Sequence, residues 1–342
     1  MEQWRSELVD AFRWGEEERA RGLVVALRKA RPRGARALLE EMLESPDGMV
    51  RQAAAFALGE LGGPASTRRL ERQLVLEEAR GDYDGASVAQ VITQALGQLK
   101  SAGARAALVR RLNRLAAGTP DQTDVNDLTY ALWRRRHPEL IPAIRGALER
   151  IALPAARALR ALLRLLESSP EELRAWVEDR SVPLDDKTEV LTVLDEEVPA
   201  ELECLLSSFI SLAQSIIDVA ATRGGVETDF CERLFTLLLL HRERLLSALS
   251  PEARSALRDV ARRMAAAPEA IRSIGAAVVL KYVGQWEDAD LLAAHRPRDD
   301  VLGKVFDDAA HALRKLGGVN LPAPRQDMAQ QPSEGGTEGE GA

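Results

Sequence analysis

Aromatic residues make up only 4% of this 342-residue chain, few for an enzyme pocket or a surface that stacks on nucleic-acid bases. Stretches with sustained period-two alternation of Val, Ile and Thr are nearly absent, which argues against a β-fold. The chain is nevertheless 46% hydrophobic, enough for a large core built from Ala, Leu and Val. The composition therefore predicts an all-helical globular protein.

Cysteine is also scarce. Cys204 and Cys231 form no CxxC pattern, and we interpret them as small buried hydrophobes in a reducing compartment. The N-terminus carries acidic residues and lacks the apolar segment of a signal peptide. Apolar runs such as LFTLLLL from Leu234 are shorter than the roughly 18 residues that span a bilayer. We expect a cytoplasmic protein with no membrane partner.

Charge is unevenly distributed along the chain. The net charge of −7 argues against general nucleic-acid binding. Residues 105–164 nevertheless contain 12 Arg and 5 acidic residues, whereas residues 165–235 contain 17 acidic and 5 basic residues. Two interpretations stay open: an ordinary solvated exterior, or a surface that steers a partner or forms a basic groove for nucleic acid.

Helical signals run almost from end to end. Helix starts recur as a capping residue, Pro and an acid, because the cap accepts from a free first-turn N–H and Pro fits the first helical position. The four examples are Ser45-Pro46-Asp47, Thr119-Pro120-Asp121, Ser169-Pro170-Glu171 and Ser250-Pro251-Glu252. Capping boxes are predicted for Thr119 with Gln122 and for Ser169 with Glu172.

The stretch DGMVRQAAAFALGELGG, residues 47–63, recurs along the chain. Its apolar face is Val50, Ala54, Ala57, Leu58 and Leu61, and a shift of 38 residues gives Val88, Ile92, Ala95, Leu96 and Leu99, with Gly97 in the place of Gly59. Shifts of 222 and 255 residues give further copies. Gly62-Gly63 follow the helix, so they predict a helix stop and not a phosphate cradle. The pattern indicates an array of similar helical units.

The same stretch resembles the second helix of a HEAT-type repeat, in particular the short bacterial kind also seen in phycobilin-lyase-like proteins. The matching positions are Asp47, Val50-Arg51, Ala53-Ala54 and Ala57-Leu58-Gly59, and GARALLEEMLES would be the preceding first helix. The resemblance is specific at 33–112, fair at 268–318 and weak across 140–265. Ala89 replaces Arg51 in the second copy, so an Asp–Arg ladder between repeats would not be continuous.

The resemblance implies an all-α, right-handed α-solenoid of about 7–8 antiparallel helix pairs with the second helices on the concave side. A tight turn at RGGVE predicts a long central hairpin of helices 198–222 and 226–247, either a thick repeat or a dimer or partner surface. The expected parts are N-terminal capping helices (1–30), HEAT-like repeats (31–197), the central hairpin (198–248), C-terminal repeats (249–318) and a disordered tail (319–342).

Motifs for chemistry are missing from the sequence. The four histidines belong to no metal-binding motif, and a P-loop, a GxSxG elbow and a GxGxxG fingerprint are all absent. Adjacent acids such as Asp185-Asp186 diverge by about 100° on a helix, so they do not converge on a substrate. We therefore predict no catalytic residue, no metal, no cofactor and no enzyme activity.

The resemblance implies a non-catalytic scaffold or adaptor that binds another protein on its concave face. The predicted contact residues are Arg51, Gln52, Glu60, Arg134, Arg135 and Arg136, with a ladder role as the alternative for Arg51. A second class is a nucleic-acid-binding or DNA-glycosylase-like protein that uses the basic 105–164 region around Trp133 and Asp127. A third is a lyase- or chaperone-like partner of a cofactor protein, for which no cofactor ligand is identified.

Overall fold

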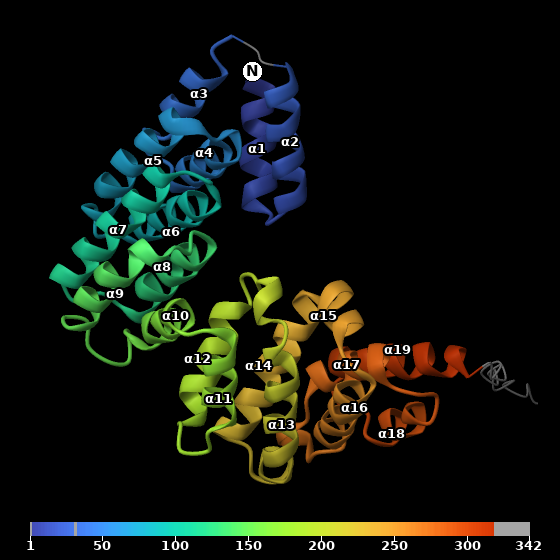
Figure 1. The fold of residues 1–342 in the computed structure, drawn as a ribbon. Helices are drawn as coiled ribbons and strands as arrows, with labels where there is room; N and C mark the ends of the chain where they lie inside the picture. The colour runs from blue at the N-terminus through green and yellow to red at the C-terminus, as the bar shows by residue number, and fades with distance from the viewer. Residues whose placement is uncertain (1, 31–32, 318–342) are drawn as a thin grey trace, which may run out of the picture.

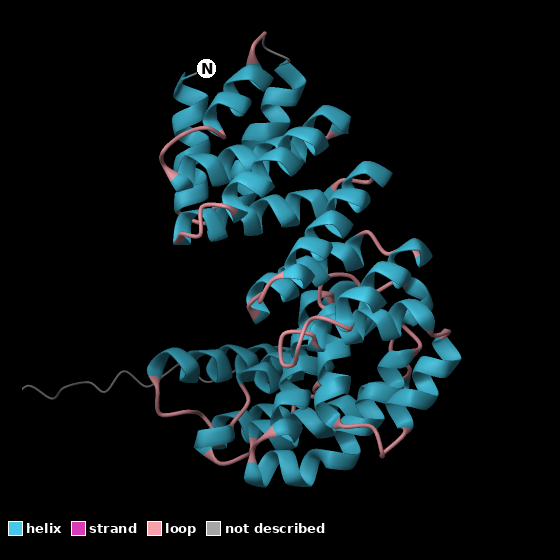
Figure 2. Cartoon of the chain, turned by 90° about the vertical axis from the view of Figure 1, so that its left-hand side faces the viewer, coloured by secondary structure: helices cyan, strands magenta, loops and turns pink. Residues whose placement is uncertain are grey.

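The computed structural model describes residues 2–30 and 33–317, and within them every regular element is a helix (Figures 1 and 2). The predicted tail at 319–342 lies outside the described residues. An outer row contains α3 (Ala35–Met42), α5 (Gly63–Glu78), α7 (Ala102–Ala117), α9 (Ile141–Leu148), α11 (Pro170–Glu178), α13 (Leu205–Arg223), α16 (Pro251–Ala265) and α18 (Asp288–Ala294). An inner row contains α4 (Gly48–Leu61), α6 (Tyr83–Gln98), α8 (Gln122–Arg134), α10 (Arg157–Glu167), α12 (Leu184–Leu194), α14 (Val226–Leu240), α17 (Ile274–Val283) and α19 (Asp300–Leu316).

The helices of the two rows alternate along the described chain and form a curved solenoid. Successive inner helices pack on one another from α4 to α19, and Figure 1 shows this row on the concave side. The outer row packs in two runs, α5–α7–α9 and α11–α13–α16–α18. The prediction of an all-α solenoid with second helices inside is therefore confirmed.

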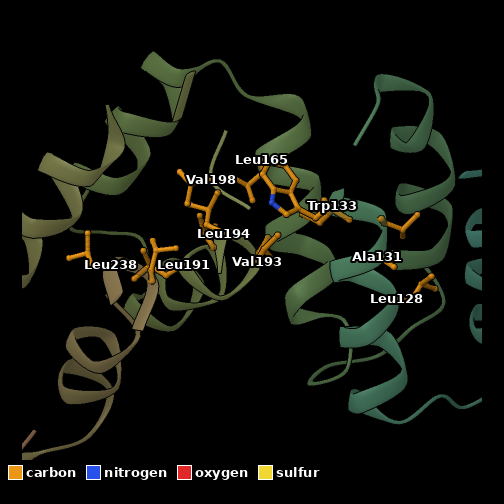
Figure 3. Close-up of a cluster of buried hydrophobic side chains, with 14 of the residues drawn as sticks. Leu128, Ala131, Trp133, Leu165, Leu191, Val193, Leu194, Val198 and Leu238 are labelled. Carbon is orange, nitrogen blue, oxygen red and sulfur yellow. The ribbon is translucent and has the colours of Figure 1, made fainter. Parts of the chain in front are cut away.

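The solenoid bends at α10. Trp133 at the end of α8 lies beside Leu165 of α10 and Val198 after α12 (Figure 3), and all three are buried. The Trp133 indole N–H donates to the carbonyl of Glu197 at 2.8 Å. The core is therefore continuous through the bend.

Close packing between inner helices depends on glycine. A Cβ built on Gly59 of α4 would lie 2.7 Å from the Cβ of Ala95 on α6, and one built on Gly97 would lie 2.9 Å from the Cβ of Ala131 on α8. The contact repeats with the 38-residue shift seen in the sequence. Gly59 and Gly97 thus serve helix approach, a role separate from the helix stop at Gly62, where φ is 71° and the N–H donates to the Leu58 carbonyl.

Two of the four predicted helix starts are confirmed. Ser250 accepts from the Ala253 N–H, and Ser169 forms the complete capping box with Glu172. The other two helices begin two residues later than predicted, because the carboxylates of Asp47 and Asp121 accept from first-turn amides instead. The capping box at Thr119 was therefore a wrong prediction.

The central hairpin forms with shorter helices than predicted. Gly224 and Gly225 make the turn at φ values of 73° and 90°, a backbone region that favours glycine. α13 begins only at Leu205, after Pro199 and a 3-10 turn, and α14 ends at Leu240, before the short α15 (Arg242–Ala248). Both helices pack within their rows, as a thick repeat would. Dimerisation through 198–248 stays a prediction.

One helical stretch among the described residues, Ala200–Arg223, is long and apolar enough to cross a membrane by length and composition. Half of its most apolar window is buried inside the protein. Phe209, Ile210 and Ala213 belong to the core, and α13 packs against α11, α14 and α16. Core helices pass the same test, so the stretch is weak evidence for a membrane span.

The N-terminal helices α1 (Glu2–Arg13) and α2 (Glu17–Ala30) form a hairpin beside the rows. Both helices pack on α4, and Figure 1 shows them on its concave side. The Trp4 indole N–H donates to the Leu23 carbonyl, and the Phe12 ring lies 5.8 Å from the Phe56 ring of α4. The hairpin therefore covers the inner face of the first repeat.

Replacing Gly59 with Ala should push α4 and α6 apart. Overpacking of a close contact costs about 1–3 kcal/mol, so the free energy of unfolding should fall by that amount in urea titrations. Gly146→Ala on α9 is the matched control, because a Cβ there meets nothing within 4 Å. The control should be neutral or stabilising by up to about 1 kcal/mol. Equal effects of the two substitutions would contradict the close-approach role.

Candidate partner-binding site

Arg51, the first predicted contact residue, is fully buried. Its guanidinium pairs with Glu77 of α5 at 2.9 Å and donates to the carbonyls of Ser45 and Pro46 in the turn before α4. Glu77 is buried as well and accepts a further hydrogen bond from Gln73. Arg51 therefore joins neighbouring repeats and cannot touch a partner, which corrects its prediction as an exposed contact and agrees with the ladder alternative.

The rest of α4 is also closed to partners. The hairpin α1–α2 covers its concave face, and residues 53–59 are all buried. Glu60 accepts from the Arg21 Nε of α2 at 3.2 Å, so it fastens the hairpin to α4. Gln52 is half-buried. The exposed second-helix surface expected here does not exist, because the helices from the N-terminus occupy it.

In the second repeat, a buried arginine on a different helix makes the link between repeats. Ala89 stands at the position of Arg51, and the buried Arg111 of α7 donates to the Ala89 carbonyl at 3.3 Å. The Arg111 guanidinium also pairs with Glu78 and Asp124, at 3.3 and 3.0 Å. A buried arginine thus links repeats in both copies, although the sequence pattern is interrupted.

Removing Arg51 should be more damaging than removing the whole pair. Arg51→Met breaks a buried pair and leaves the Glu77 carboxylate with the exposed Arg80 as its remaining cation, at 3.1 Å; breaking a buried pair typically costs about 3–5 kcal/mol. The double variant Arg51→Met with Glu77→Met should recover most of that loss, since the buried carboxylate is gone and water can solvate Arg80. Urea unfolding of both variants measures the difference. A double variant less stable than Arg51→Met would contradict this account.

Two of the three arginines at the end of α8 form ion pairs across the bend. Arg134 donates to Glu196 at 2.7 Å, and Arg136 donates to both carboxylate oxygens of Glu197 at 2.9 and 3.0 Å. The Arg136 guanidinium also lies over the Trp133 ring, 4.9 Å from its centroid. These contacts hold α8 to the segment after α12. Arg134 and Arg136 are therefore already engaged, unlike the free contacts that were predicted.

Arg135 is the exception and faces a pocket. The cavity, which we name the arginine pocket, has a volume of about 520 Å³. Its lining comes from the α6–α7 connection, the start of α7 and the ends of α8 and α12: Lys100, Ser101, Ala102, Arg105, Arg134, Arg135, Arg136 and Glu197. Five of the eight residues are cationic. The structure thus brings the Arg134–Arg136 run together with two cations that were not predicted.

The open concave face begins at α6 and continues to α14. No hairpin covers it within the described residues, and its exposed or half-exposed side chains include Gln94, Gln98, Asn126, Tyr130, Glu189, Arg233 and Thr236. Burial and the nearby charge of Glu189 together raise the pKa of Tyr130 to about 12. Burial also raises the pKa of Glu189. We expect contacts here to be made by neutral Tyr130 and by mixed charges.

Asp195 lies beside this face at the end of α12. It accepts from Arg233 at 2.8 Å, yet burial raises its pKa to about 6. Its other carboxylate oxygen, Oδ1, is buried and has no hydrogen-bond partner in the structure. Above pH 6 the Asp195 carboxylate is therefore charged while one of its oxygens is buried without a hydrogen-bond donor.

This arrangement predicts a pH-dependent stability. The folded chain binds the Asp195 proton more tightly than the unfolded chain, whose Asp pKa is about 3.9, so stability falls as pH rises from about 4 to 6. As the pH is raised from 4 to 7, the free energy of unfolding of Asp195→Asn, measured in urea titrations, should increase by about 1–3 kcal/mol relative to that of the unmodified protein. The exposed control Asp308→Asn should show no such gain. A pH-independent difference for Asp195→Asn would refute the assignment.

The side chains offer little for catalysis. No group of three or more His, Cys, Asp or Glu in the part of the chain described could hold a metal ion. Burial raises the pKa of the Cys231 thiol to about 12, so it is a poor nucleophile. Both cysteines are free, and Cys204 is exposed, so the interpretation as a buried hydrophobe holds for Cys231 and is wrong for Cys204.

Residues 6–82 match a family model described as HEAT repeats. Residues 6–82 therefore consist of HEAT repeats. The matched region begins within α1 and ends at the residue before α6. It therefore includes most of the α1–α2 hairpin, the pair α3–α4 and the single helix α5. No curated protein matches the chain.

Trp133 and Asp127, the two residues at the centre of the nucleic-acid alternative, are both engaged within the fold. Trp133 is 2% exposed and cannot stack on a base. Asp127 is half-buried and accepts from Gln90. Eight of the twelve arginines in 105–164 pair with carboxylates, most of them outside that segment: Arg105, Arg110, Arg111, Arg114, Arg134, Arg136, Arg145 and Arg157. Ion pairs therefore neutralise most of the arginines in residues 105–164.

Lys100 and Arg105 were missed by sequence reasoning. They lie 30 or more residues before Arg135, and only the stacking of α7 beside α8 brings them to one pocket. The available signal was their position at the start of α7, with Lys100 directly before the capping Ser101 and Arg105 in the first turn and a half after it, because cations near a helix N-terminus oppose its dipole.

Proposed function

We propose that this chain is a non-catalytic scaffold or adaptor whose protein partner occupies the open concave face between α6 and α14. HEAT repeats generally serve as protein-interaction scaffolds. One observation carries the location: the hairpin α1–α2 covers α4, whereas the inner helices from α6 onward keep a polar face exposed. A cytoplasmic location is part of the proposal.

The N-terminal edge of this face supplies an apolar anchor point. A pocket of about 300 Å³ lies between the α1–α2 turn, α4 and α6, and its lining includes Phe12, Phe56, Val91 and Gln94. Apolar pockets beside polar surface are where interface anchors usually insert. A partner side chain that enters it would be fixed against a rigid wall, because Phe56 and Ala95 belong to the core.

Site-specific photocrosslinking tests the location. A photoreactive amino acid at Gln94 of α6 or Thr236 of α14 should trap the same protein from source extract. Arg72 of α5 and Gln214 of α13, exposed on outer helices, are the matched controls and should give much less product. Equal trapping at the outer positions, or no trapped protein at the inner ones, would refute the proposed surface.

A further inference from the structure

The arginine pocket holds more positive charge than its surroundings balance. Of its five cations, Arg105 pairs with Glu139, Arg134 with Glu196 and Arg136 with Glu197. Arg135 and Lys100 have no ion pair among the described residues. The pocket therefore keeps two uncompensated charges.

Arg135 is poorly accommodated where it stands. Its Nε is buried and has no hydrogen-bond partner in the structure. Burial lowers the pKa of Arg135, the nearby Glu197 raises it, and repulsion from Arg136, Arg134 and Arg105 lowers it. The side chain as a whole is half-buried, so the cost comes from the Nε that is withdrawn from water without a partner, and a bound anion would return part of it.

The start of α7 adds to the same potential. Ser101 caps the helix by accepting from the Ala104 N–H, which leaves the amides of Ala102 and Gly103 without an intrahelical acceptor. Ala102 lines the pocket. The positive end of this 16-residue helix thus lies at the pocket that Lys100 and Arg135 line.

We propose that the arginine pocket binds a phosphate group carried by a phosphorylated serine or threonine of the protein partner. A phosphate monoester carries about −1.5 to −2 charges at pH 7, which matches the two uncompensated cations. The planar guanidinium of Arg135 suits two phosphate oxygens at once. This inference rests on the proposed function, since the phosphate belongs to the partner of the concave face.

The pocket adjoins that face. Glu196 pairs with Arg134 of the pocket, and its charge also raises the pKa of Tyr130 on the open concave face. A chain lying along α8 could therefore reach both.

The charges around the arginine pocket favour a single phosphate group over a polyanion. The carboxylates of Glu139, Glu196 and Glu197 surround the cations and would repel the successive phosphates of a nucleic acid or an anionic membrane. Trp133 beneath the pocket is buried, so it offers no stacking surface for a base. These features favour a protein-borne phosphate.

The test uses the full chain and two degenerate peptide libraries that differ only in phosphorylation of a central serine or threonine. Fluorescence anisotropy should show that the phosphorylated library binds at least about tenfold more tightly. Arg135→Gln should weaken that binding about ten- to hundredfold, as expected for hydrogen bonds to a charged group, and Lys100→Gln should weaken it less. Arg150→Gln, an exposed arginine that lines no pocket described above, should leave it unchanged.

Equal binding of the two libraries, or no effect of Arg135→Gln, would overturn the inference. So would Arg135-dependent binding of inorganic phosphate, a random RNA duplex or phosphatidylserine vesicles that is tighter than binding of the phosphorylated library. Phosphatase treatment of the extract separates the two proposals. Trapping at Thr236 that survives both phosphatase and Arg135→Gln would leave the concave surface standing and refute the phosphate. Absence of trapping at Thr236 in the untreated extract, with library binding intact, would refute only the concave surface.

Discussion

The contact between glycine and alanine on neighbouring inner helices sets the geometry of this HEAT-repeat solenoid. Gly59 meets Ala95, and Gly97 meets Ala131, at distances that admit no further carbon. The inner helices therefore approach more closely than side chains of ordinary size allow. The outer helices lack this series of contacts and carry long side chains such as Arg110 between them. A stack with one tightly spaced row curves towards that row, which places the inner helices on the concave side.

Buried arginines connect the repeats that this packing brings together. Each connection satisfies backbone carbonyls and a carboxylate at once: Arg51 does so from an inner helix, and Arg111 does so from the following outer helix. The physical requirement is conserved between the two repeats although the residue that meets it changes position. For this reason the interrupted Asp–Arg pattern in the sequence does not mean an interrupted structure.

Local signals predicted the fold well. The apolar face at Val50 and Val88, the caps at Ser169 and Ser250 and the stop at Gly62 all act within one or two helical turns, so spacing reveals them. The burial of Arg51 could not be predicted in this way, because its carboxylate partner, Glu77 of α5, lies 26 residues later in the chain. The pairing of Arg134 and Arg136 depends on glutamates about 60 residues later. Only the tertiary bend at α10 brings them together.

The charge reversal near residue 165 is a second feature whose meaning changes in the folded chain. The sequence places an excess of arginine before it and an excess of acid after it, which suggests two charged surfaces. In the folded chain the two segments meet across the bend and their charges partly cancel through four ion pairs among the described residues: Arg134 with Glu196, Arg136 with Glu197, Arg145 with Glu167 and Arg157 with Asp185. What decides binding is the charge left after this cancellation. Among the arginines of residues 105–164 that have no ion pair in the described structure, Arg135 is the one that lines the arginine pocket, together with the unpaired Lys100.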